Sequence, residues 1–235
     1  MKNEVTFHVK HSDRGDTEVP FDPFASLSDA QREQFDAYAN RLRRINRKIN
    51  LISPDTEPHI RERHLLHCLA LTWRGFPAGS RIVDWGTGGG LPAIPLAIAF
   101  PEIEVFAVDS VGKKVRAVRA MARRLGLKNL FVWNGRAEDW TGSAHYSVSR
   151  ATAPLADLWR WHRRIVDPDV PSSDDDVWAP GLICLKGGDL SVEIADLRVI
   201  DEAVQVEQHL LRPLLGRSYF ADKYIVTVRR SGSAS

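Results

Sequence analysis

Sulfur-bearing residues are scarce, because the 235 residues include only two cysteines and two methionines. Cys68 and Cys184 lie far apart in the chain and outside any Cys-x-x-Cys pair. That spacing argues against a disulfide framework, a structural zinc site and an iron–sulfur cluster. We therefore expect two buried thiols and no metal ion.

Long apolar runs are also missing. No segment approaches the roughly 20 apolar residues that a membrane-spanning helix requires. Residues 2–18 are largely polar, so no apolar signal-peptide core follows Met1. Hydrophobic residues form 43% of the chain and charged residues 26%, as in globular proteins. The sequence thus predicts a cytoplasmic protein with one main domain and no membrane partner, and we expect a monomer.

The formal net charge of +2 conceals a polarised distribution. Residues 110–130 carry seven lysines and arginines and no acid, whereas residues 165–202 carry ten acids and two basic residues. A polyanionic partner could dock on the basic segment. The alternative is that the segment is simply the solvated face of a helix.

The chain divides into three segments by composition. Residues 1–27 contain few aliphatic side chains and predict a poorly ordered lead-in. Residues 28–78 predict a helical extension, with one amphipathic helix capped by Ser28 and a second over about 60–73. Residues 79–235 predict the main domain, interrupted by an acidic, proline- and serine-rich surface excursion at 167–180.

Short β-type runs alternate with helical runs throughout the main domain. The runs are "RIVDW", "EVFAVD", "LFVWN", "YSVSR", "GLICLK", "QVEQHLL" and "YIVTVRR". The first five predict parallel strands covered by helices on both faces, and the last two predict a closing antiparallel pair. The expected fold is therefore α/β and Rossmann-like, with a mostly parallel seven-stranded sheet.

A glycine-rich turn follows the first predicted strand, in the stretch "VDWGTGGGLPAIPLA" at residues 83–97. The strand ends at Asp84, and the glycines are Gly86, Gly88, Gly89 and Gly90. Glycines permit positive φ angles and close approach of a ligand, and the following helix start offers free N–H groups. The position between strand and helix favours a nucleotide-like ligand over a purely structural turn.

The residues around this turn reduce the number of ligand classes that it could bind. No Gly-Lys-Ser/Thr follows, which disfavours Walker-type phosphate binding, and Leu91 occupies the third glycine position of a dinucleotide motif. Asp109 lies 23 residues beyond Gly86, where a carboxylate can accept both ribose hydroxyls of NAD or of S-adenosylmethionine. The alternative role of Asp109 is to cap the next helix. With Glu138 after the third strand, the acids favour an adenosine that carries a sulfonium cation rather than a pyrophosphate.

Taken together, these segments resemble the bacterial small-subunit ribosomal RNA guanine-N7 methyltransferases, also called glucose-inhibited division protein B. The resemblance runs from about residue 32 to 160 and more weakly to 188. It is carried by "INLIS", "RHLLHCLA", "DWGTGGGLPAIPLA", "VDSVGKKVRAVRAMARRLGLKNL", "GRAEDW", "SRATAPL" and "LKGG". It departs from the family pattern at His67-Cys68, in place of Asp-Ser, and at Ala93, in place of Gly.

The resemblance implies an S-adenosylmethionine-dependent methyltransferase domain at 79–235 that methylates N7 of guanine 527 of 16S rRNA. The cofactor contacts that it implies are Asp84, Gly86, Gly88, Leu91, Asp109, Ser110, Ala137, Glu138 and Arg150. Guanine N7 has a free lone pair and no proton to lose, so the transfer requires alignment more than acid–base chemistry. We expect Arg150 to be the catalytic residue, able to stack on or hydrogen-bond the target guanine, with a structural ion pair as the alternative. His64 either contacts the substrate or belongs to the core.

The expected partner is 16S rRNA, as naked RNA or within the 30S subunit. The candidate RNA-binding residues are Arg43, Arg44, Arg47, Lys113, Lys114, Arg116 and Lys186. Two other functions remain open at this point. One is an NAD-dependent oxidoreductase, and the other is a non-catalytic RNA-binding module for ribosome assembly on the same fold.

Overall fold

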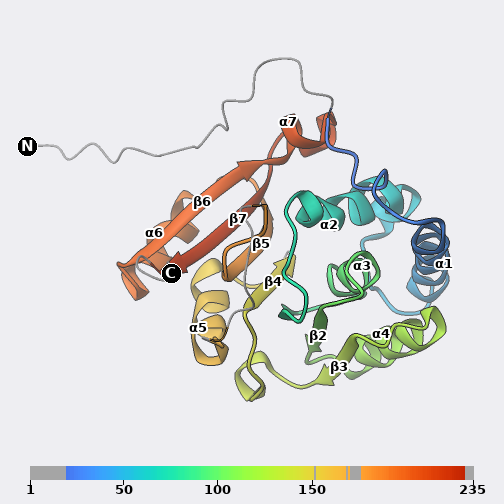
Figure 1. Ribbon diagram of the computed structural model, residues 1–235, viewed down its shortest axis with the longest axis horizontal. Helices are drawn as coiled ribbons and strands as arrows, with labels where there is room; N and C mark the ends of the chain where they lie inside the picture. The colour runs from blue at the N-terminus through green and yellow to red at the C-terminus, as the bar shows by residue number, and fades with distance from the viewer. Residues whose placement is uncertain (1–19, 151, 168, 170–175, 231–235) are drawn as a thin grey trace, which may run out of the picture.

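A single seven-stranded sheet organises the protein, whose computed structural model describes residues 20–150, 152–167, 169 and 176–230. The strands are β1 (Arg81–Trp85), β2 (Glu104–Asp109), β3 (Leu130–Asn134), β4 (Tyr146–Arg150), β5 (Gly181–Gly187), β6 (Val204–Leu210) and β7 (Lys223–Arg230). Their order is β3-β2-β1-β4-β5-β7-β6, as can be followed in Figure 1. The first five are parallel, and β7 runs antiparallel to both β5 and β6. The predicted mostly parallel, seven-stranded fold is confirmed.

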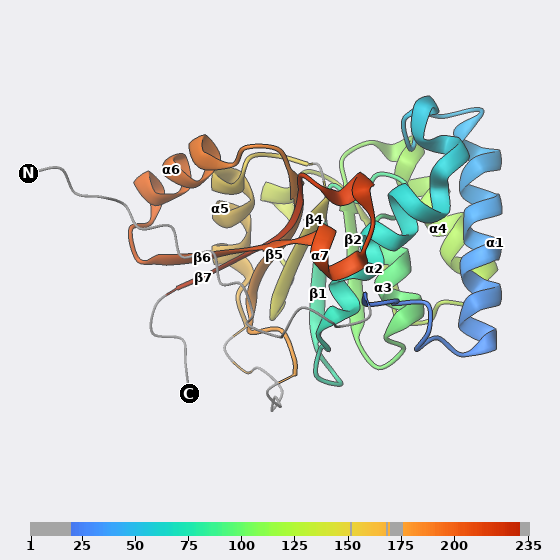
Figure 2. The same cartoon turned by 90° about the horizontal axis from the view of Figure 1, so that it is seen from above.

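Helices cover both faces of this sheet (Figure 2). The α-helices are α1 (Asp29–Asn46), α2 (His67–Leu69), α3 (Ala93–Ala99), α4 (Gly112–Leu125), α5 (Leu155–Ile165), α6 (Ser191–Ile200) and α7 (Leu211–Leu215). The side chains of α3 and α4 pack into one apolar cluster together with α1 and α2, and those of α5 and α6 pack into a second cluster on the other face. No helix in the described part of the chain is long and apolar enough to cross a membrane.

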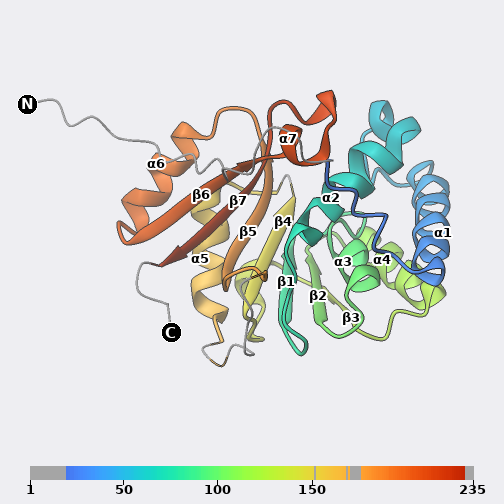
Figure 3. The same cartoon turned by 45° about the horizontal axis from the view of Figure 1, so that its top comes forward.

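Helix α1 lies outermost, over α3 and α4 (Figures 2 and 3). It begins with a capping box, in which Gln31 N donates to Ser28 Oγ and Ser28 N donates to the Gln31 side chain. Gln31 Nε2 also donates to the Ile98 carbonyl at 2.8 Å, and Gln34 Nε2 donates to the Leu125 carbonyl at 2.8 Å. These bonds fix the helix against the ends of α3 and α4.

The second predicted helix is longer and less regular than its sequence pattern indicated. A 3₁₀ segment (Pro54–His59) leads into a π-helical segment (Ile60–Leu66), α2 and another 3₁₀ segment (Ala70–Trp73). Pro54 suits the first turn because proline lacks the N–H that would be unpaired there. A spacing rule of 3.6 residues per turn cannot predict the wider π turn, which carries His64. Two further 3₁₀ turns occur, Ala137–Asp139 and Ser218–Phe220.

Two segments pack more closely than their composition suggested. Residues 1–19 lie outside the described residues, but at 20–27 Phe21 N donates to the Leu214 carbonyl at 2.8 Å, so this part of the expected lead-in is packed. Residues 168 and 170–175 of the acidic excursion are likewise outside the described residues. Trp178 is buried and its indole N–H donates to the Leu71 carbonyl at 2.7 Å. The end of that excursion therefore belongs to the core, because one large aromatic ring outweighs its polar neighbours.

Candidate active site

The carboxyl ends of β2, β1 and β4 lie side by side in the sheet, so the loops that follow them meet at one edge. The loop between β1 and α3 is the predicted glycine turn. Gly86, Gly88 and Gly90 have φ values of 71°, 56° and 90°, in the region that favours glycine. A Cβ atom at Gly86 would lie 2.3 Å from Thr152 Cγ2, so the turn also needs glycine because of the loop after β4.

Asp109, at the end of β2, holds this turn in place. Its Oδ2 accepts a hydrogen bond from Gly88 N at 2.9 Å, and its Oδ1 accepts one from Val111 N at 2.8 Å. The carboxylate therefore supports the start of α4, as a capping residue would, and also supports the glycine turn. Each carboxylate oxygen has more than one lone pair, so both oxygens can still accept a ribose hydroxyl.

Asp84, at the end of β1, is fully buried beneath the same turn. Its Oδ2 accepts from Ala93 N at 3.1 Å, so the departure at position 93 leaves this main-chain bond in place. Asp84 Oδ1 and Thr87 Oγ1 form no hydrogen bond of good geometry among the described residues, although the Thr87 hydroxyl lies close enough to lower the Asp84 pKa. Burial raises the pKa of Asp84 to about 7, opposed by the Thr87 hydroxyl, the Ala93 N–H and the Arg150 charge. A buried acceptor of this kind fits the cationic end of a ligand better than a phosphate.

Arg150 ends β4 and points toward the helical extension. Its Nη1 donates to His64 Nδ1 at 2.9 Å, and His64 Nε2 lies 2.8 Å from Thr56 Oγ1. A guanidinium group can only donate, so Nδ1 is the acceptor and Nε2 carries the proton that is donated to Thr56. Burial, followed by the charges of Arg150 and Arg63, lowers the pKa of His64 to about 3. His64 is thus a neutral, buried residue that orients Arg150.

The structure places the remaining predicted cofactor residues at different depths. Ser110 is exposed next to Asp109, whereas Leu91 is buried in the core and offers only its backbone to a ligand. Ala137 and Glu138 form the 3₁₀ turn after β3. Glu138 Oε1 accepts from the Trp161 indole of α5 at 3.0 Å, a contact between segments that no sequence pattern indicated.

Lys186 differs from its predicted role. Its Nζ donates to the Ala153 carbonyl at 2.7 Å and to Glu193 Oε2 at 2.8 Å, and its side chain is only 9% exposed. The structure does not support an RNA contact for Lys186, because the ammonium group is already paired inside the chain. The sequence could not indicate this pairing, because Lys186 lies in β5 and its partner Glu193 lies on a separate helix, α6.

The other candidate RNA-binding residues gather on two neighbouring helices. Arg43 and Arg44 lie in the last turn of α1, with Arg47 directly after it. Lys113, Lys114 and Arg116 lie in the first two turns of α4, and the two helices are in contact. Within the described residues, none of the six forms an ion pair with an acid, and Arg43 Nη1 donates a hydrogen bond to Asn40 Oδ1 at 3.5 Å. The structure therefore places the two separate basic stretches on helices that contact each other.

The remaining departures from the family pattern lie in the core. The His67 ring packs against Phe220 with ring centroids 5.5 Å apart, and burial holds the pKa of His67 well below its usual value. Cys68 and Cys184 are both buried free thiols, as expected, and burial raises the pKa of each to about 12. His67 is thus a packing residue at this position.

Known sequences resemble this chain over most of its length. Residues 31–170 match the family described as rRNA small subunit methyltransferase G. A protein named ribosomal RNA small subunit methyltransferase G from Salinibacter ruber is 64% identical over 213 residues, which cover 90% of this chain and 98% of that one. Its namesake from Bacteroides fragilis (strain ATCC 25285) is 38% identical over 206 residues, covering 87% and 96%.

Solved structures share the fold at low sequence identity. A ribosomal protein L11 methylase from Lactobacillus delbrueckii has a TM-score of 0.53 at 16% identity and covers 72% of this chain and 79% of its own. A SAM-dependent methyltransferase from Aquifex aeolicus has a TM-score of 0.51 at 16% identity, covering 75% and 98%. These structures support the fold class and nothing finer.

Proposed function

The chain belongs to the rRNA small subunit methyltransferase G family, and from this we propose that it transfers the methyl group of S-adenosyl-L-methionine to N7 of guanine 527 in 16S rRNA. One observation carries the proposal. The glycine turn is tied to Asp109 through Gly88 N, at the strand edge where Arg150 also ends its strand. A nucleoside-binding turn and a base-recognising cation therefore share one edge of the sheet.

The residues at this edge fit the methyl donor. Asp109 would accept the ribose hydroxyls, while the backbone of Gly86 and Gly88 allows close approach. Asp84 Oδ1, which forms no hydrogen bond of good geometry among the described residues, lies beneath the turn, where it suits the cationic methionine end. The remaining proposed contacts are Leu91, Ser110, Ala137 and Glu138. When bound, S-adenosylmethionine supplies an electrophilic methyl group on a sulfonium.

Arg150 is the proposed catalytic residue. Guanine N7 needs no deprotonation, so the protein's main task is to align its lone pair with the methyl group. One Arg150 N–H is donated to His64, and the guanidinium has further donors for O6 of the guanine, or can stack on its ring. Such recognition requires the target base to be unpaired or extruded. His64 acts as a positioning residue because it fixes the guanidinium.

The rRNA backbone would contact the basic surface of α1 and α4. The proposed contacts are Arg43, Arg44, Arg47, Lys113, Lys114 and Arg116. We further propose that the protein acts as a monomer in the cytoplasm, on 16S rRNA either naked or within the 30S subunit. The two other functions lack support, because the related proteins are named as methyltransferases and not as NAD enzymes or as binding modules.

Methyl transfer can be tested directly. The protein is incubated with tritiated S-adenosylmethionine and either naked 16S rRNA or 30S subunits, both prepared from cells that lack this modification. We expect label in at least one substrate, and mapping of the labelled nucleotide should place it at N7 of guanine 527. Binding of rRNA without label in either substrate would favour the non-catalytic module, and preferential binding of NAD in calorimetry would favour the oxidoreductase.

A further inference from the structure

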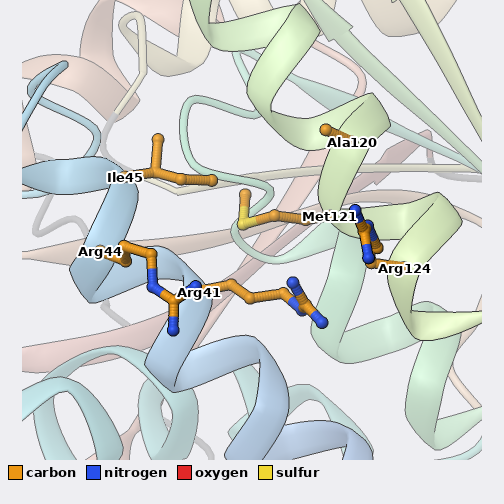
Figure 4. Close-up of a pocket in the computed structure, with 6 residues that line it drawn as sticks. All are labelled: Arg41, Arg44, Ile45, Ala120, Met121 and Arg124. Atoms are coloured by element: carbon orange, nitrogen blue, oxygen red, sulfur yellow. The ribbon is translucent and has the colours of Figure 1, made fainter.

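A basic pocket lies between α1 and α4 (Figure 4). It has a volume of about 140 Å³ and is lined by Arg41, Arg44, Ile45, Ala120, Met121 and Arg124. Arg41 extends from α1 toward α4, and Met121 extends from α4 in the opposite direction (Figure 4). The two helices thus build a pocket with cationic groups around an apolar wall.

The cations in this pocket have no partner in the part of the chain that the structure describes. Arg41, Arg44 and Arg124 form no ion pair or hydrogen bond through their side chains with any described residue, and no acid lines the pocket. Arg41 Nε is buried and has no acceptor among the described residues. Guanidinium groups placed together repel one another, and an anion between them relieves the repulsion and satisfies the donors. The chemistry of the pocket therefore selects an anionic group.

The pocket is large enough for only one chemical group of a larger ligand. Pockets that enclose a whole small ligand usually have volumes of roughly 300–1,000 Å³. The volume here, about 140 Å³, suits a single phosphate and part of its sugar. Ile45, Ala120 and Met121 offer an apolar wall to that sugar. A polymer with repeated phosphates matches these features better than a free nucleotide.

We propose that this pocket binds one backbone phosphate of the substrate rRNA, with the adjoining ribose on the apolar wall. The proposal rests on the proposed function and adds an anchor outside the methyl-transfer edge. Helix α1 connects the two places, because Tyr38 Oη donates to the Gly89 carbonyl at 2.9 Å. A Cβ at Gly89 would lie 3.0 Å from Leu42 Cδ1, so α1 also packs directly on the turn. An rRNA strand anchored at Arg41 is thereby held at a fixed position relative to the glycine turn.

The first test compares two adjacent arginines on α4. Both are exposed, but Arg124 lines the pocket and Arg123 does not. Binding of naked 16S rRNA is measured over a range of salt concentrations for Arg124→Gln and for its matched control, Arg123→Gln. We expect Arg124→Gln to weaken binding about tenfold, since a hydrogen bond between charged groups is lost. We expect it also to lower the salt slope by about 0.7, the value for one single-strand phosphate contact. Arg123→Gln should change affinity less than twofold.

The second test fills the pocket without changing charge. Ala120 is exposed on α4, so Ala120→Leu should fold normally and occupy the space beside Met121. We expect rRNA affinity to fall about fivefold with a rise in KM for rRNA and an unchanged kcat, because uniform binding is lost. The affinity for S-adenosylmethionine should stay within twofold of wild type in every variant.

The outcomes separate this proposal from the proposed function. Equal losses for Arg123→Gln and Arg124→Gln, with wild-type affinity for Ala120→Leu, would overturn the pocket even if methyl transfer is found. A loss confined to 30S subunits, with unchanged binding of naked rRNA, would overturn it in favour of an acidic protein partner. Pocket-dependent rRNA binding without any methyl transfer would support the pocket and contradict the proposed function.

Discussion

Basic side chains are used differently in two regions of this molecule. At the ends of β4 and β5, Arg150 and Lys186 each bind a partner side chain within the chain. Between α1 and α4, Arg41 and Arg124 have no such partner among the described residues. A paired cation has a fixed direction, which suits base alignment or core stability, whereas an unpaired cation is available to an anionic ligand. The role of a basic side chain in this protein is therefore indicated by whether it has a partner, more than by its positive charge.

The largest effect on kcat should come from Arg150, at the strand edge that also carries the glycine turn. We expect Arg150→Ala to lower kcat about 10²–10³-fold, the range seen when a preorganised donor is removed from an active site. Arg150→Lys should recover little, because an ammonium group lacks the planar fork. Single-turnover methylation of 16S rRNA measures the effect. A variant with wild-type kcat would return Arg150 to the purely structural role that the sequence also allowed.

Lys186→Met should act on stability rather than on rRNA binding. Removing the buried ammonium leaves Glu193 without its partner, and we expect the free energy of unfolding to fall by about 2 kcal/mol. Glu193 is 32% exposed and also accepts from Leu155 N, which limits the loss. Urea unfolding measures it, and Lys186→Met with Glu193→Gln should restore part of it. A fall in rRNA affinity at unchanged stability would restore Lys186 as an RNA contact.

His64→Leu should lower kcat about tenfold, because Arg150 loses the acceptor that fixes its direction. His64→Gln retains an acceptor and should lose less, which separates positioning from simple packing.

The pH dependence of the unfolding free energy independently tests whether His64 is neutral. The pKa of His64 is lowered to about 3 from 6.5, so the neutral imidazole contributes stability above pH 6.5 that is lost as pH falls toward 3. Between pH 6 and 4, the unfolding free energy of wild type should therefore fall more steeply than that of His64→Gln. Parallel curves would contradict a buried neutral His64.

The smallest effect per residue should occur on the basic surface of α4. Lys113→Ala combined with Arg116→Ala should weaken rRNA binding about fivefold and reduce the salt slope by about 1.4, for two single-strand phosphate contacts. The S-adenosylmethionine affinity should not change, whereas Asp109→Ala should abolish it. Equal loss of cofactor binding in both variants would contradict the separation of the two sites.

Much of the fold was predictable because its signals are local. Short apolar runs alternating with helical ones fixed the strand positions to within about a residue, as in β1 and β3. Ser28 correctly predicted the start of α1, and the structure shows that Gln31, three residues later, completes the capping box. The wider turns at residues 60–66 escaped prediction, since π-helical spacing follows from contacts that the local sequence does not record.

The candidate site likewise contains residues that the sequence predicted and contacts that it did not. Glycines at positive φ and an acid at the next strand end are short-range requirements of a nucleoside-binding turn, so Gly86, Gly88 and Asp109 could be named in advance. The Trp161 partner of Glu138 and the His64 partner of Arg150 could not. Both contacts join separate elements, 23 and 86 positions apart in the chain.

Local sequence patterns sufficed to predict the alternation of strands and helices, the glycine turn, the acid that supports it and the excess of cations on two stretches. Which of these cations are paired depends on how the elements pack in three dimensions. The fold pairs Lys186 with Glu193, turns Arg150 toward a neutral histidine, and places Arg41 and Arg124 in one pocket that no acid among the described residues lines. The physical reason is that local spacing governs backbone conformation, whereas the partner of a long charged side chain depends on the path of the whole chain.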